Sequence, residues 1–193
     1  TEDTYEVDGE PYFGYMRGRY TKEELKDIVS YCNGIGVEVI PCIQTLAHLN
    51  CIFKWPAYDE IIDCNDILYV GQERTYELIE KMFKTMRECF TTDAIHIGMD
   101  EAHMVGLGRY LDKYGYKKRS EILIPHLTRV LEIAKKYNFK PMIWSDMFFK
   151  LANKGSYDVI SGELDKAVIE KTPEEVGLVY WNYYNTEKEH YTK

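Results

Sequence analysis

The sequence has 193 residues, of which 45% are hydrophobic and 29% charged, and a formal net charge of −8 at pH 7. This length and composition are those of a globular domain with a hydrophobic core. The negative charge argues against nucleic acid as a partner, and the absence of any apolar run of ~20 residues or of a signal peptide argues against a membrane partner.

The first predicted helix begins at a capping-box pattern, in which Thr21 is followed three residues later by Glu24. Apolar residues then recur at helical spacing as far as Cys32, and Asn33-Gly34 ends the helix. The apolar run over 37–43 that follows is typical of a buried strand.

The next segment, 46–71, has little periodicity, so we expect a long loop of the kind that often carries function. A second helix is predicted over about 73–90, where apolar residues form one face. The short apolar run Ala94–Met99 follows it and predicts a buried strand that ends at Asp100.

A third helix is predicted over about 119–137, and the run 141–144 after it predicts another strand. Two further short strands are predicted at 157–161 and 178–181. Helix, turn and strand therefore alternate along the chain, which favours an α/β fold of βα units around parallel strands. Such units curl into a TIM (β/α)8 barrel, which needs ~250 residues. We therefore predict a single partial barrel domain over 1–193, with roughly half of the βα units.

Polar and aromatic residues follow these predicted strands, at the end where α/β folds place their chemistry. Asp100 and Glu101 are adjacent carboxylates directly after a strand, an arrangement that provides one site with both an acid and a base. Groups that follow the other strands are expected to meet the two acids at the same rim. These are His48, Trp144, Trp181 and Tyr183.

Cysteine and histidine spacing argues against a metal or a disulfide framework. The five cysteines are an odd number without Cys-x-x-Cys spacing. His96, Glu101 and His103 lack the His-Glu-x-x-His spacing of a helical zinc site. We therefore predict neither a metal nor another cofactor. Free thiols fit reducing conditions and favour a cytoplasmic location.

The strand-end motifs resemble those of family-20 glycoside hydrolases, the β-N-acetylhexosaminidases, in the central part of the catalytic barrel. The family's His-x-Gly-Gly-Asp-Glu element matches His96–Glu101 here, with Met99 in place of the second glycine. An acid-x-x-x-His element after a proline matches the segment from Gln44 to His48, which follows Pro41. Gln44 stands where the family has an acid.

This resemblance implies a substrate-assisted retaining mechanism that releases terminal β-linked N-acetylhexosamine, GlcNAc or GalNAc. The acetamido oxygen of the substrate attacks the anomeric carbon, in place of an enzyme nucleophile. Glu101 then corresponds to the general acid and base, and Asp100 to the carboxylate that orients the acetamido group. The substrates implied are glycans that contain N-acetylhexosamine.

The resemblance also implies binding roles for the other residues at the strand ends. Trp144 and Trp181 correspond to walls around the sugar, and His48 and Tyr183 to hydrogen-bonding groups. The family's substrate arginine on the first strand has no counterpart here, so this chain alone is expected to be inactive. Open parallel edges pair readily with other chains, so a second copy of this chain is an expected partner, in a homo-oligomer.

Two alternatives remain open at this point. The first is a non-catalytic carbohydrate-binding protein on a degenerate barrel, which keeps the aromatic pocket without turnover. The second is a different barrel hydrolase that uses a carboxylate nucleophile. A helicase reading of the Asp-Glu-Ala-His sequence at 100–103 is excluded, because no Gly-rich phosphate loop ending in Gly-Lys-Ser/Thr is present.

Overall fold

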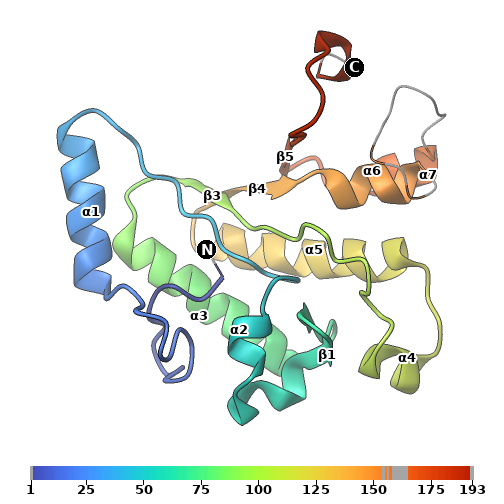
Figure 1. Ribbon diagram of the computed structural model, residues 1–193, viewed down its shortest axis with the longest axis horizontal. Coiled ribbons are helices and arrows are strands. Elements are labelled where there is room, and N and C mark those ends of the chain that lie inside the picture. Colours follow the sequence, from blue (N-terminus) through green and yellow to red (C-terminus); the bar gives the residue numbers. More distant parts are fainter. Residues whose placement is uncertain (1, 154, 156, 158–164, 192–193) are drawn as a thin grey trace.

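The structure is a computed structural model that describes residues 2–153, 155, 157 and 165–191. Its central feature is a parallel sheet of mixed α/β architecture, with strand order β3-β4-β5 (Figure 1). The strands are β3 (Ala94–His96), β4 (Lys140–Trp144) and β5 (Gly177–Val179). Because all three run in the same direction, their carboxyl ends lie at one edge of the sheet.

Three long helices occupy the predicted positions. They are α1 (Lys22–Gly34), α3 (Glu73–Cys89) and α5 (Arg119–Lys136). The capping box of α1 is formed, since Thr21 Oγ1 accepts from the Glu24 backbone N–H and the Glu24 side chain accepts from the Thr21 N–H. Helix α3 packs against both α1 and α5 (Figure 1). The periodicity of apolar residues therefore predicted these helices correctly.

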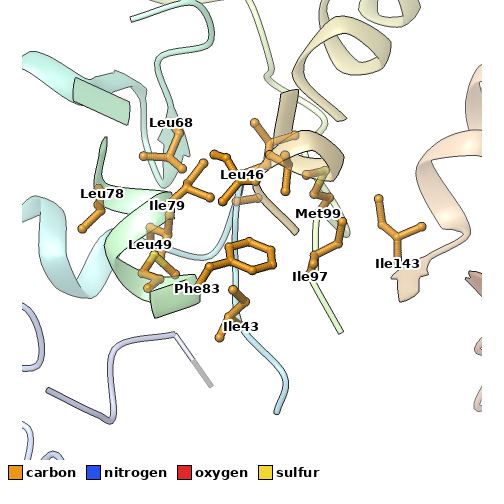
Figure 2. Close-up of a cluster of buried hydrophobic side chains, with 14 of the residues drawn as sticks. Ile43, Leu46, Leu49, Leu68, Leu78, Ile79, Phe83, Ile97, Met99 and Ile143 are labelled. Carbon is orange, nitrogen blue, oxygen red and sulfur yellow. The ribbon is translucent and has the colours of Figure 1, made fainter. Parts of the chain in front are cut away.

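The hydrophobic core joins the apolar face of α3 to the sheet and to the segment before α2. Figure 2 shows part of this cluster, with the labelled residues Ile43, Leu46, Leu49, Leu68, Leu78, Ile79, Phe83, Ile97, Met99 and Ile143. Burying each side chain of this size contributes roughly 1.5–3 kcal/mol relative to exposure. The core thus fixes the chain immediately before and after β3, where the predicted acids follow.

The prediction of a buried strand over 37–43 is only partly right. Cys42 forms an isolated parallel bridge with His96, and the His96 N–H donates to the Pro41 carbonyl at 2.8 Å. The ladder does not extend further, because Pro41 has no N–H to donate. Val37 is 50% exposed, so the start of this run is not buried. The segment nevertheless lies beside β3 and runs in the same direction.

The segment over 46–71, expected to be one long loop, contains four short elements. Each element in this segment is too short to produce a periodic pattern, which is why the sequence did not reveal it. Asn65 adopts a left-handed conformation, with φ 47°, at the turn of a small antiparallel hairpin. The elements are α2 (Asn50–Phe53), the 3-10 helix η1 (Pro56–Ile61), β1 (Ile62–Cys64) and β2 (Ile67–Leu68).

Several short helices complete the described part of the chain. The strand predicted at 178–181 corresponds to β5, whereas most of the strand predicted at 157–161 lies outside the described residues. Among the helices that the structure describes, none combines the length and apolar character needed to span a membrane. The short helices are α4 (Arg109–Tyr114), α6 (Asp146–Ala152), α7 (Lys166–Ile169) and the 3-10 helix η2 (Lys188–His190).

Candidate active site

A hollow of about 400 Å³ lies beyond the carboxyl ends of the three parallel strands. Parallel strands bring their carboxyl ends together, so residues distant in sequence meet there. We call this hollow the strand-end pocket. Its lining residues are Asp100, Glu101, Trp144, Trp181, Tyr183 and Tyr184.

The turn after β3 presents both acids to the same neighbour. In a continued strand, side chains at 100 and 101 would point to opposite faces. Here Met99 and Glu101 adopt left-handed conformations, with φ 66° and 52°. His48 Nε2 consequently lies 3.2 Å from Asp100 Oδ2 and 3.7 Å from Glu101 Oε2. The backbone turn thus gathers two successive carboxylates around one imidazole.

Asp100 is held by an amide from the neighbouring segment. Gln44 Nε2 donates to Asp100 Oδ1 at 2.9 Å, and Gln44 Oε1 accepts from the Met99 N–H at 3.2 Å. Gln44 is 7% exposed, and the Asp100 side chain is 19% exposed. One side chain therefore fixes both the carboxylate and the backbone that precedes it.

His48 is held from behind by Asp66, which lies at the turn of the β1–β2 hairpin. The His48 backbone N–H donates to Asp66 Oδ2 at 3.0 Å, and His48 Nδ1 lies 3.8 Å from the same oxygen. His48 Nε2 has no partner with hydrogen-bond geometry, so its approach to the two acids is electrostatic. The hairpin that the sequence did not predict thus positions an imidazole beside both carboxylates.

Glu101 is held through its backbone while its side chain stays open to the pocket. Its N–H donates to Asp146 Oδ2 at 3.1 Å, and its side chain is 47% exposed. Asp146 is fully buried at the start of α6, and Lys150 Nζ lies 3.4 Å from the same Asp146 oxygen. A charged acceptor makes a strong hydrogen bond to a backbone N–H.

His96 supports the base of the pocket from beneath Trp144. The two rings lie 4.2 Å apart between centroids. His96 Nδ1 accepts from the Gly98 N–H at 3.1 Å, which places the proton of the neutral ring on Nε2. Burial lowers the pKa of His96 to about 4, although the Asp100 charge acts in the opposite direction. The imidazole under the pocket is therefore an uncharged aromatic ring close to Asp100.

The far side of the strand-end pocket is aromatic and open. The Trp181 and Tyr183 rings lie 5.5 Å apart between centroids, and the Trp181 backbone N–H donates to the Tyr157 hydroxyl at 3.0 Å. Tyr183 and Tyr184 are 81% and 91% exposed. These rings offer flat faces of the kind that bind apolar surfaces of ligands.

The chain matches the family model described as glycosyl hydrolase family 20, catalytic domain, over residues 5–192. The protein belongs to this family. It is similar to hexosaminidase D of Homo sapiens, with 22% identity over 191 residues, 94% of this chain and 37% of that protein. The chain thus spans little more than a third of this relative.

Solved structures of the same family have a similar fold. One is the exo β-N-acetylglucosaminidase of Vibrio harveyi with N-acetylglucosamine, at a TM-score of 0.70 and 16% identity, covering 93% of this chain and 31% of that one. Another is the N-acetyl-β-hexosaminidase of Streptomyces plicatus with Thio-NAglucal, at a TM-score of 0.67 and 20% identity, covering 98% of this chain and 36% of that one. At these identities the similarity establishes the fold.

Three residues that hold the acids or His48 in place, Gln44, Asp66 and Asp146, were given no role from the sequence. The motif comparison noted Gln44 only as a departure from the family's acid, and Asp146 was not assigned a function. Asp66 gave no signal, because its contact with His48 depends on a hairpin too short to predict. In the described part of the chain, no group of three or more His, Cys, Asp or Glu side chains is placed to hold a metal ion. His103 instead lies 3.4 Å from Lys150 Nζ.

Proposed function

We propose that this chain carries the acid residues of an exo-acting β-N-acetylhexosaminidase, which removes terminal β-linked GlcNAc or GalNAc from glycans. One observation carries the proposal. Asp100 and Glu101 lie side by side on a pocket that is also lined by Trp144 and Trp181. Acid groups that face flat aromatic walls suit a site that binds a sugar ring and cleaves its glycosidic bond. Membership of family 20 supports the same reaction.

In the proposed mechanism the substrate's acetamido oxygen attacks the anomeric carbon, and the bond to the leaving oxygen breaks. Glu101 donates a proton to that oxygen, and later takes one from the water that opens the cyclic intermediate. Its open side chain on a fixed backbone suits a group that must reach the leaving oxygen. Asp100 accepts the acetamido N–H and stabilises the positive charge that develops on the ring formed.

The remaining pocket residues are proposed to bind the sugar. Trp144 and Trp181 enclose the ring and the acetamide methyl group, and Tyr183 offers a phenol hydroxyl at the open side. His48 lies within 4 Å of both carboxylates and is proposed to help hold them in place. Its own position is fixed by Asp66.

We also propose that the described sheet is an arc of a (β/α)8 barrel within one catalytic domain. The segment at Cys42 and strands β3, β4 and β5 run in parallel and follow one another in sequence order. Helix α3 leads from the first to β3, and α5 leads from β3 to β4. This repeat of strand and helix is the building unit of the barrel, and the family's solved structures match this chain over about a third of their length.

The test uses the full-length protein with nitrophenyl N-acetyl-β-glucosaminide and its galacto epimer. We expect release of nitrophenol and strong inhibition by a thiazoline analogue of the cyclic intermediate. Sugar binding without hydrolysis would instead support the carbohydrate-binding alternative. Covalent trapping by a fluorosugar, without thiazoline inhibition, would support a carboxylate nucleophile.

A further inference from the structure

Gln44 is a buried amide at the end of the segment beside β3, next to the proposed acids. Its two polar atoms are both used. Nε2 donates to Asp100 Oδ1 at 2.9 Å, and Oε1 accepts from the Met99 N–H at 3.2 Å. A carboxylate at position 44 would need to bind an extra proton before it could make the same two contacts, since an ionised carboxylate only accepts.

We propose that Gln44 is a positioning residue that supplies Asp100 with a hydrogen-bond donor independent of pH. This inference rests on the proposed function and deepens it. An acid at this position would lie within hydrogen-bond distance of Asp100, and two carboxylates so close share one proton. The amide supplies the donor without a shared proton, so Asp100 is held in the same orientation over the working range of the enzyme.

The backbone around Gln44 is built for this contact. Gly98 has φ +71°, and a Cβ atom added there would lie 2.0 Å from Gln44 Oε1 and 2.8 Å from the Ile43 carbonyl oxygen. Only a glycine at this position, just after β3, leaves room for the Gln44 amide. The next residue, Thr45, donates from Oγ1 to the Ile97 carbonyl at 2.8 Å, which fixes the segment on the other side of the amide.

The two oxygens of the Asp100 carboxylate face different neighbours. Oδ1 accepts from Gln44, whereas Oδ2 faces His48 Nε2 at 3.2 Å. With Oδ1 fixed, the carboxylate cannot rotate freely, and Oδ2 is the oxygen left to accept a substrate N–H. The titratable groups around Asp100 are Glu101, His48, His96 and Cys42.

The decisive variant is Gln44→Glu in the full-length protein. With one shared proton, the new pair reproduces the donor to Asp100, so kcat/KM near the acidic end of the active range stays within a few-fold of wild type. Once that proton is lost, two adjacent charges repel, and kcat/KM relative to wild type falls about tenfold for each further pH unit. Dividing by the wild-type profile removes the titrations that both proteins share.

A second variant, Gln44→Met, removes the donor and the acceptor at similar length. A hydrogen bond to a charged group is worth about 1.5–3 kcal/mol, so we expect kcat/KM to fall about 10- to 100-fold at every pH, with no added pH slope. Gln72→Glu is the matched control, because it makes the same change at the start of α3, away from the pocket. Its profile should follow wild type.

The outcomes separate this inference from the proposed function. If wild type releases nitrophenol and Gln44→Glu has a profile parallel to it, the proposed role of Gln44 is wrong. If wild type has no activity on any N-acetylhexosaminide, the proposed function itself fails. Thermal unfolding of each variant identifies loss of the fold, and a soluble Gln44→Glu protein with the pH-dependent loss supports the inference even if Gln44→Met does not fold.

Discussion

The two sides of the strand-end pocket are built differently. On the acid side, Asp100 is hydrogen-bonded by a buried amide, and the Glu101 backbone is hydrogen-bonded by a buried carboxylate. On the aromatic side, Tyr183 and Tyr184 are more than four-fifths exposed. The difference indicates which groups need exact placement. A proton transfer depends on geometry to within a fraction of an ångström, whereas a ring face tolerates some movement of the sugar that it contacts.

The largest effect is expected on the acid side, from Glu101→Gln. This variant removes the proposed proton donor and leaves the pocket shape intact. We expect kcat to fall about 10²- to 10⁴-fold, the usual contribution of a general acid or base. Steady-state kinetics on a nitrophenyl N-acetylhexosaminide measures the loss. Glu23→Gln, an exposed residue in the first turn of α1, is the control and should retain full turnover. Unchanged turnover in Glu101→Gln would exclude it as the acid.

Asp100→Asn tests the other half of the acid side. The carboxylate that stabilises the developing charge is lost, so we expect kcat to fall about 10²- to 10³-fold on N-acetylated substrates. The Kd of a sugar ligand without the acetamido group should change much less than that of an N-acetylated ligand, because it makes no contact with Asp100 in the proposed mechanism. Asp112→Asn on α4 makes the same change at an exposed position. Equal losses of affinity for both ligands would contradict the assigned role.

The buried His96, which lies under the acid side of the pocket, also predicts that the free energy of unfolding depends on pH. Burial lowers the pKa of His96 to about 4 from an ordinary value of 6.5. Between these pH values the unfolded chain binds a proton at this position and the folded chain does not, so stability falls as the pH drops. The loss reaches about 3 kcal/mol near pH 4.

Chemical denaturation of wild type and His96→Gln between pH 4 and 7 measures this effect. The variant keeps an oxygen that can accept from the Gly98 N–H. It lacks the imidazole that binds up to one extra proton in the unfolded state, so its free energy of unfolding should fall less steeply than that of wild type as the pH drops. His126 has its pKa lowered by burial in the same direction, but it is present in both proteins. Identical slopes would show that His96 does not titrate as proposed.

The smallest effect is expected on the aromatic side. Tyr183→Ala removes one open ring face, which is worth about 1 kcal/mol or less, so we expect KM to rise about 2- to 5-fold with kcat unchanged. Tyr116→Ala is a matched control, since Tyr116 is 73% exposed and does not line the pocket. A large fall in kcat for Tyr183→Ala would mean that the aromatic side is as finely positioned as the acid side.

The sequence predicted the parts of the molecule that follow from periodicity. The long helices and the strand before Asp100 have apolar patterns that packing preserves, and positions at strand ends indicated where the acids would lie. Pairings between elements were not predictable. The contacts of Asp66 with His48 and of Asp146 with the Glu101 backbone join residues 18 and 45 positions apart. They depend on how a short hairpin and a helix start are placed by the rest of the fold.

The strand over 37–43 shows a limit of a different kind. Its apolar residues suggested burial on both faces, but burial requires other elements that cover those faces. Cys42 forms a bridge with His96, whereas Val37 and Ile40 remain exposed by 50% and 41%. Sequence patterns report what a segment is suited to pack against, and a neighbouring strand must be present for that packing to form.

The close approach of Gly98 to Gln44 restricts how this protein can change over evolutionary time. A side chain at position 98 would meet the Gln44 amide and also the Ile43 carbonyl oxygen, which belongs to the backbone, so a shorter residue at 44 would not by itself make room for it. Position 98 should therefore remain glycine even in lineages where position 44 varies.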